Sequence, residues 1–127
     1  MEKIDHIEIV VKDIPLCLDF YINKLSFSLL SRYNLASPHF EEAAFIQHNE
    51  VRIELLKARD SLVTTEPARI FGIRLPAFEV QDMGVTLDSL ERQGITPSWR
   101  LKNLGDSIRA EIKDIEGNLI ELRQWIT

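Results

Sequence analysis

The tripeptide Ile53-Glu54-Leu55 returns near the end of the chain as Ile120-Glu121-Leu122. Each copy lies in a run where apolar and polar residues alternate, which is the pattern of a strand with one buried face. In both copies Ile and Leu share the buried face and the glutamate points to the other one. Two such strands, each closing a half of the chain, predict a duplicated module with a carboxylate at a matching position in each half.

The segments before each copy also follow one order. A strand is expected first, then an aspartate that caps a helix, then three strands. The expected elements of the first half are a strand over 4–11, the N-cap Asp13, a helix over 14–25, and strands over 29–33, 43–47 and 51–56. Those of the second half are a strand over 70–80, the N-cap Asp82, a helix over 83–93, and strands over 96–101, 108–113 and 118–125.

This order predicts an α+β fold made of two tandem βαβββ modules. The first module spans 1–60 and the second spans 70–127, and a polar linker without clear periodicity is expected over 61–69. The two modules form one pseudo-symmetric domain. A ferredoxin-like pair of βαββ units is an alternative, but the third strand after each helix disfavours it.

Composition excludes several classes of protein. The net charge of −5, with Lys and Arg scattered along the chain, argues against a nucleic-acid-binding protein. No run of 18 apolar residues is present, so no membrane span is expected. One cysteine, Cys17, excludes an internal disulfide framework, and the acidic N-terminus is unlike a secretory signal. A cytoplasmic location is therefore expected.

Three stretches resemble the vicinal oxygen chelate superfamily, which includes glyoxalase I, bleomycin-resistance proteins, extradiol dioxygenases and methylmalonyl-CoA epimerase. They are Ile4-Asp5-His6-Ile7, the pair Leu18-Asp19-Phe20-Tyr21 and Leu25-Ser26-Phe27, and Asp114-Ile115-Glu116-Gly117-Asn118-Leu119-Ile120-Glu121-Leu122. The resemblance implies a partly open, barrel-like mixed sheet around a central cleft that handles a small molecule. It also implies a homodimer, with the cleft formed within one chain or between two subunits.

The resemblance further implies a metal site with one ligand from the first and one from the last strand of each module. The matching positions are His6, Glu54, Leu75 and Glu121. Leu75 stands where metal-dependent relatives usually have histidine, so the implied ligands are His6, Glu54 and Glu121. A divalent Zn, Ni, Mn or Fe ion would suit them, or no metal at all. Glu121 is the candidate catalytic base of a metal-dependent lyase, isomerase or dioxygenase.

The strand alternation places further candidates on the face opposite the helices. The predicted substrate-binding residues on this face are Glu8, Arg52, Leu75 and Arg123, and Trp99 on the short strand of the second module is a further one. Glu8 is also a candidate for an additional oxygen ligand, and Arg52 or Arg123 could neutralise the glutamates without a metal. Trp99 could stack on a flat ligand, or lie in the core or in a dimer interface.

A metal-free protein that sequesters a drug or another small molecule is the alternative function. Ile73, Leu75, Ala77 and Leu56 would make one side of its site apolar, as small-molecule sites usually are. The presence of His6, Glu54 and Glu121 favours the enzyme, while the loss of histidine at Leu75 favours the sequestering protein. Both functions remain open at this point.

Overall fold

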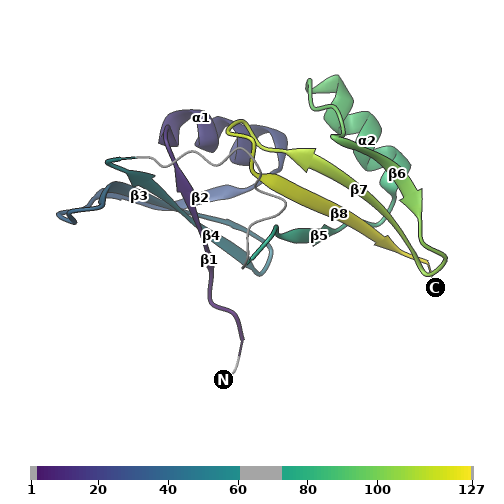
Figure 1. Ribbon diagram of the computed structural model, residues 1–127, viewed down its shortest axis with the longest axis horizontal. Helices are drawn as coiled ribbons and strands as arrows, with labels where there is room; N and C mark the ends of the chain where they lie inside the picture. Colours follow the sequence, from purple (N-terminus) through teal and green to yellow (C-terminus); the bar gives the residue numbers. More distant parts are fainter. Residues whose placement is uncertain (1–2, 61–72, 127) are drawn as a thin grey trace. The chain divides into compact units, whose positions relative to one another are not determined.

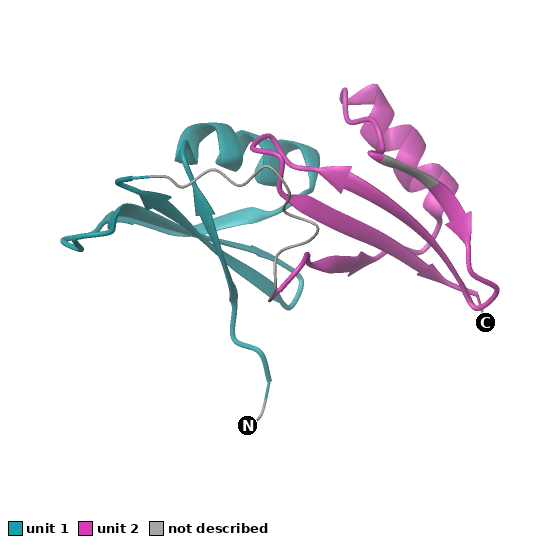
Figure 2. Cartoon of the chain, viewed as in Figure 1, with its two compact units in different colours: residues 1–63 teal, residues 64–127 magenta. Residues whose placement is uncertain are grey.

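The chain divides into two compact units, residues 1–63 and 64–127 (Figure 2). The computed structural model describes residues 3–60 and 73–126, except for the side chains of Trp99 and Arg100. The predicted linker over 61–69 lies outside the described residues.

The first unit contains one four-stranded sheet with a helical segment packed against it (Figure 1). Its elements are β1 (Ile7–Val11), α1 (Ile14–Leu18), the π-helix η1 (Asp19–Lys24), β2 (Ser28–Asn34), β3 (Phe40–His48) and β4 (Val51–Ala58). The strand order is β1-β4-β3-β2, in which β1 and β4 are parallel and the other pairs are antiparallel. The first and last strands of the unit are therefore neighbours.

The second unit has the same topology. Its elements are β5 (Ala77–Glu79), α2 (Met83–Arg92), β6 (Trp99–Asn103), β7 (Ser107–Lys113) and β8 (Leu119–Trp125). The strand order is β5-β8-β7-β6, again with the first and last strands parallel. The predicted α+β fold with two βαβββ repeats is confirmed. Among the described residues the strands form two separate four-stranded sheets and do not close into a barrel.

Both helices begin at the predicted aspartates. An Asp13 side-chain oxygen accepts a hydrogen bond from the Leu16 amide at 2.9 Å, and Asp82 accepts one from Val85 at 2.9 Å. Such caps satisfy amides that have no partner within the helix. Helix α2 ends before Gly94, whose φ of 82° suits a residue without a side chain.

The first helix differs from the prediction of a regular helix over 14–25. The α-helical part ends at Leu18, and the chain continues as a π-helix to Lys24. The wider turn of a π-helix, with i→i+5 hydrogen bonds, accompanies burial of both Phe20 and Tyr21. Hydrophobic spacing does not distinguish this arrangement from an α-helix.

Two strands of the second unit are shorter or shifted relative to the prediction. The strand expected over 70–80 is observed only over Ala77–Glu79, and residues 70–72 of that prediction lie outside the described part. Pro76 precedes it and has no N–H to extend a ladder, although its carbonyl accepts a hydrogen bond from the Glu121 amide at 3.0 Å. Similarly, β6 begins at Trp99 rather than at residue 96, after Pro97.

Each sheet buries one face against the helical segment of its own unit. Helix α1 packs on β3 and β4, and α2 packs on β8. The strand residues on the helix-covered faces are fully buried: Ile46, Ile53 and Leu55 in the first unit, and Ile112 and Ile120 in the second. The glutamates between them, Glu54 and Glu121, point to the opposite face.

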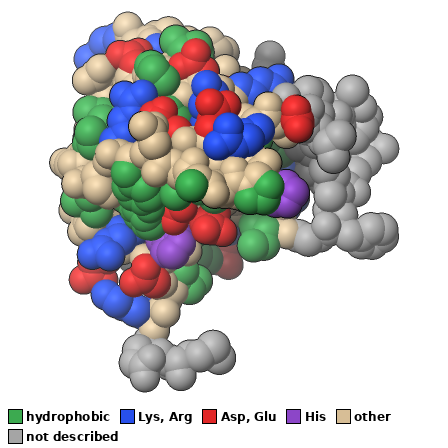
Figure 3. All heavy atoms as spheres, turned by 90° about the vertical axis from the view of Figure 1, so that its left-hand side faces the viewer, with side chains coloured by type: hydrophobic (Ala, Val, Ile, Leu, Met, Phe, Trp, Pro, Cys, Tyr) green, Lys and Arg blue, Asp and Glu red, His purple; other side chains and the backbone are tan. Residues whose placement is uncertain are grey.

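No helix in the described parts of the chain is long and apolar enough to span a membrane. On the surface shown in Figure 3, acidic and basic side chains are interspersed, without a broad area of one sign.

Candidate metal site in the first unit

His6 lies one residue before β1, and its ring is held from two sides. Its Nδ1 atom is 2.9 Å from an oxygen of Asp5, and the Phe45 ring on β3 meets it edge-on at a centroid distance of 5.2 Å. When Nδ1 donates its hydrogen to Asp5, Nε2 of the neutral ring keeps its lone pair. Metal-binding histidines commonly use a carboxylate in this way to fix the ring and its tautomer.

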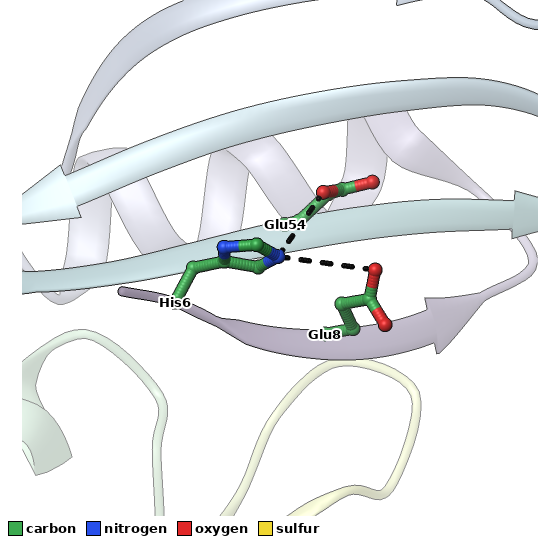
Figure 4. A group of neighbouring side chains, drawn as sticks. All are labelled: His6, Glu8 and Glu54. Atoms are coloured by element: carbon green, nitrogen blue, oxygen red, sulfur yellow. Dashed lines mark ion pairs between the residues drawn. The ribbon is translucent and has the colours of Figure 1, made fainter. Parts of the chain in front are cut away.

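Glu8 and Glu54 come together because β1 and β4 pair in parallel with these two residues in register. Alternation along each strand turns both carboxylates away from the helix-covered face. His6 Nε2 lies 3.5 Å from an oxygen of Glu54 and 3.8 Å from one of Glu8 (Figure 4). The three side chains therefore point toward a common centre.

The charges in this cluster are poorly balanced. Burial raises the pKa of Glu54, and the negative charge of Glu8 raises it further, while His6 acts in the opposite direction. The hydrogen bond that His6 donates to Asp5 raises the pKa of His6 and lowers the pKa of Asp5. Burial opposes the rise at His6, and the negative charge of Glu54 adds to it. In the described part of the chain, no lysine or arginine forms an ion pair with Glu8 or Glu54.

The cluster fits a divalent cation. One ligand atom from each of His6, Glu8 and Glu54 lies within 4.8 Å of the others. Bonds of about 2.0–2.2 Å to one ion allow ligand atoms to be separated by at most about 4.4 Å, so small side-chain rotations bring them into range. One imidazole and two carboxylates suit Zn, Ni, Mn or Fe without selecting among them.

The second unit presents a different set of residues at the matching positions. Glu121 pairs in register with Ala77 as Glu54 does with Glu8, so Leu75 takes the place of His6. Instead of an imidazole, two arginines approach Glu121. Arg123 Nε donates to Glu121 at 2.7 Å, and an Arg109 nitrogen lies 3.0 Å from its other oxygen.

The remaining predicted residues have other surroundings. Arg52 donates to the Gln47 side chain at 3.1 Å and forms no ion pair with Glu54 among the described residues. Leu75 is half-buried, and Trp99 lies on β6, opposite Glu111, with its side chain outside the described part. Arg123 also contacts Ser107 Oγ at 3.1 Å and lies over the Trp125 ring.

The predicted site residues do not include Asp5, Phe45 or Arg74. Arg74 forms an ion pair with Glu111 at 3.2 Å, and Arg109 also pairs with that carboxylate. A signal for part of this network was present, since Arg109-x-Glu111 and Glu121-x-Arg123 place opposite charges on one face of two adjacent strands. Asp5 precedes His6 directly, and no periodicity predicts that such neighbours bond.

The chain is similar to known proteins in sequence and in fold. The family model described as the Glyoxalase/Bleomycin resistance protein/Dioxygenase superfamily matches residues 3–122. No curated protein matches the chain.

Several solved structures share the fold at low sequence identity. A glyoxalase family protein from Enterococcus faecalis is 20% identical with a TM-score of 0.84, over 96% of this chain and 97% of that one. A glyoxalase family protein from Bacillus cereus is 19% identical with a TM-score of 0.81, over 100% and 96% of the two chains. An antibiotic binding protein from Streptomyces sp. CB03234 is 18% identical with a TM-score of 0.75, over 99% and 98%.

Proposed function

Since the chain belongs to the Glyoxalase/Bleomycin resistance protein/Dioxygenase superfamily, we propose that it binds a divalent metal and uses it to act on a small oxygenated molecule. The observation that carries this proposal is the convergence of His6, Glu8 and Glu54 within 4.8 Å, with no arginine or lysine paired to either glutamate among the described residues. A lyase, isomerase or dioxygenase reaction fits this family.

We assign the ligands of the first unit as His6 Nε2 and one oxygen each of Glu8 and Glu54. Leu75 stands at an expected ligand position but has no donor atom, and Glu8 provides an additional donor in the first unit. A metal bound there would polarise an oxygen of the substrate. Three protein ligands leave coordination positions for water or substrate.

The surrounding residues prepare His6 and Glu54 for this role. Asp5 holds the His6 ring so that Nε2 faces the two carboxylates, and Phe45 limits rotation of the ring. Phe45 also lies opposite Glu54 in the β3–β4 register, where the second unit has a charged residue opposite Glu121. That charged residue is Glu111, which shares Arg109 with Glu121, whereas Phe45 brings no ion-pair partner to Glu54.

The sequence also predicts Glu121 as a ligand and as the catalytic base, and this stays a prediction. Both of its oxygens have arginine partners on its own sheet. A metal or a proton bound to Glu121 would have to compete with Arg109 and Arg123, whose guanidinium groups remain charged at all ordinary pH values.

The alternative is a metal-free protein that binds an antibiotic or another small molecule. The shared fold of the Streptomyces antibiotic binding protein favours it, as does Glu121, whose charge is balanced by arginines without a metal. For this function the small molecule should bind equally well in the presence of EDTA. For the metal-dependent function, EDTA should abolish binding or turnover.

Metal content tests the proposal directly. Protein loaded with Mn, Ni, Zn or Fe(II) and then dialysed should retain about one ion per chain, and Glu54→Gln should retain none. Asp5→Asn leaves the three ligands in place but weakens the support of His6, so we expect a loss of affinity of about 10- to 100-fold.

Glu42→Gln is the matched control. Glu42 lies on β3 of the same sheet and pairs with Arg32 at 2.8 Å, away from His6. Its metal content should equal that of the wild type. Failure of all four ions to bind the wild type, or equal retention by Glu54→Gln, would overturn the proposed metal site.

A further inference from the structure

We propose that the substrate of the metal site carries a carboxylate, and that Arg52 binds this carboxylate while another oxygen of the same molecule meets the metal. The class of substrate is therefore a small organic acid with a second oxygen group. The proposal rests on the metal-dependent function above, because it concerns the same face of the same sheet.

Arg52 lies on the face of the first sheet that carries the proposed ligands. It stands two residues before Glu54 on β4, so strand alternation places both side chains on one face, roughly 6.8 Å apart along the strand. His6 directly precedes the first residue pair of the β1–β4 register, and Arg52 lies at the same end of that register. A small molecule with oxygen groups at its two ends can therefore reach both the metal and the guanidinium group.

Gln47 fixes the direction of the Arg52 guanidinium group. The two residues are opposite each other in the β3–β4 register, and Arg52 Nε donates a hydrogen bond to Gln47 Oε1 at 3.1 Å. Gln47 is itself anchored, because its Nε2 donates to the Asn49 carbonyl at 2.7 Å. An arginine that is ordered before the ligand arrives loses less conformational entropy on binding, so Gln47 is a positioning residue.

The outer edge of the Arg52 guanidinium group is accessible to a ligand. The residue is exposed, and in the described part of the chain its Nη1 and Nη2 atoms form no hydrogen bond or ion pair. These two nitrogens present parallel N–H donors, which match the two oxygens of a carboxylate. The end of the side chain is thus suited to bidentate binding of an organic acid.

The positive charge of Arg52 acts on the His6 side of the proposed metal site. The hydrogen bond with His6 lowers the pKa of Asp5, burial opposes this, and the charge of Arg52 lowers the pKa further. Asp5 nevertheless bonds to the His6 ring and forms no ion pair with Arg52 among the described residues. The arginine is therefore near the imidazole, and its N–H donors are not occupied by the neighbouring carboxylate.

An aromatic side chain lies beside these two anchors. Phe45 is opposite Glu54 on β3 and two residues before Gln47, so its half-buried side chain is on the same face. An apolar surface next to a few placed polar groups is typical of small-molecule sites. The hydrocarbon part of an organic acid fits this surface.

The second unit has different residues at the matching positions. Leu119 takes the place of Arg52, two residues before the matching glutamate, and Lys113 lies opposite it in the β7–β8 register. The paired arginine and glutamine therefore accompany the proposed metal ligands of the first unit and are not a general feature of the repeat.

The test uses two hydroxamates that differ only at one end. A hydroxamate group binds divalent metals through its two oxygens; glutaric monohydroxamate adds a terminal carboxylate, where valerohydroxamate has a methyl group. Each is titrated by calorimetry, at constant ionic strength, into the full chain loaded with whichever of Mn, Ni, Zn or Fe(II) it retains best. We expect the wild type to bind glutaric monohydroxamate about tenfold more tightly than valerohydroxamate.

Substitutions at Arg52 and Gln47 assign this preference to the proposed residues. Arg52→Gln should remove the preference and leave the affinity for valerohydroxamate unchanged, which also shows that the variant folds and holds its metal. Arg52→Lys keeps the charge without the paired donors, so it should retain only part of the preference. Gln47→Met should reduce the preference as well, and it tests the proposal should Arg52→Gln fail to fold.

Arg32→Gln is the matched control. Arg32 lies on β2 of the same sheet and pairs with Glu42 at 2.8 Å, so its loss should leave the preference at the wild-type value. Equal affinity of the loaded wild type for both hydroxamates, or a preference that survives Arg52→Gln, would overturn the carboxylate proposal and leave the metal site standing. A wild type that retains none of the four ions would overturn the metal site, and the substrate assignment with it.

Discussion

Glu54 and Glu121 occupy matching positions in two sheets of the same topology, yet their neighbours differ. Glu54 lies beside Glu8 and His6, whereas Glu121 lies beside two arginines. The same residue type therefore lies beside another carboxylate and an imidazole in one unit and beside arginines in the other. The proposed metal site uses the glutamate that has no arginine partner among the described residues.

The imbalance predicts that Glu54 reduces stability in the metal-free protein. Because its pKa is raised in the folded state, the folded protein holds the proton more tightly than the unfolded chain does. The ionised form at neutral pH is then disfavoured by folding. Replacing it by neutral Glu54→Gln should therefore raise the free energy of unfolding at pH 7.

The effect of Glu54 on the free energy of unfolding should also change with pH. Between the unfolded pKa, near 4.5, and the higher folded pKa, the wild type gains stability as the pH falls. The advantage of Glu54→Gln, measured by urea unfolding without metal, should therefore shrink as the pH is lowered through this window. Glu42→Gln should have the opposite sign, because Arg32 lowers the pKa of Glu42. A less stable Glu54→Gln at pH 7 would contradict the account.

At the level of elements, much of the fold was predictable. Alternation predicted the strands and which face each glutamate occupies, because a strand's period of two leaves few choices once one face is buried. The partnership of His6 and Glu54 followed from the family resemblance. The arginine partners of Glu121 could not be predicted in this way. The contacts of long arginine side chains depend on their rotamers, which the alternation of apolar and polar residues does not determine.

The π-helix and the turn after it were also not predictable. In the Leu25-Ser26-Phe27 turn, Ser26 has a φ of 65°. This region is unfavourable for residues with a Cβ atom, by roughly 1–2 kcal/mol. Two features of the next residue hold the serine there. The Phe27 side chain is buried, and the Phe27 amide donates a hydrogen bond to the Tyr21 carbonyl at 2.9 Å.

Ser26→Gly should therefore stabilise the protein. The gain should be about 0.5–1 kcal/mol after the greater flexibility of glycine in the unfolded chain is included. Thermal and urea unfolding measure it. Ser31→Gly is the control, because Ser31 lies within β2, where glycine should be destabilising. A Ser26→Gly protein no more stable than the wild type would show that the positive φ carries no cost here.

At the scale of the whole molecule, one repeat has produced two units with different chemistry. The first brings His6, Glu8 and Glu54 together, and the second carries an arginine network at the matching strands. The homodimer, the cytoplasmic location and the roles of Trp99 and Leu75 in substrate binding stay predictions. Sedimentation equilibrium would measure whether the chain forms a homodimer.

The most direct test of the central claim, a metal at His6, Glu8 and Glu54, uses the three histidines of the chain. Mn²⁺ added in substoichiometric amounts broadens the NMR signals of nuclei near it. The account predicts selective broadening of the His6 ring signals, with His39 and His48 unaffected and the effect absent in Glu54→Gln. Equal broadening of all three histidines, or none at His6, would contradict it.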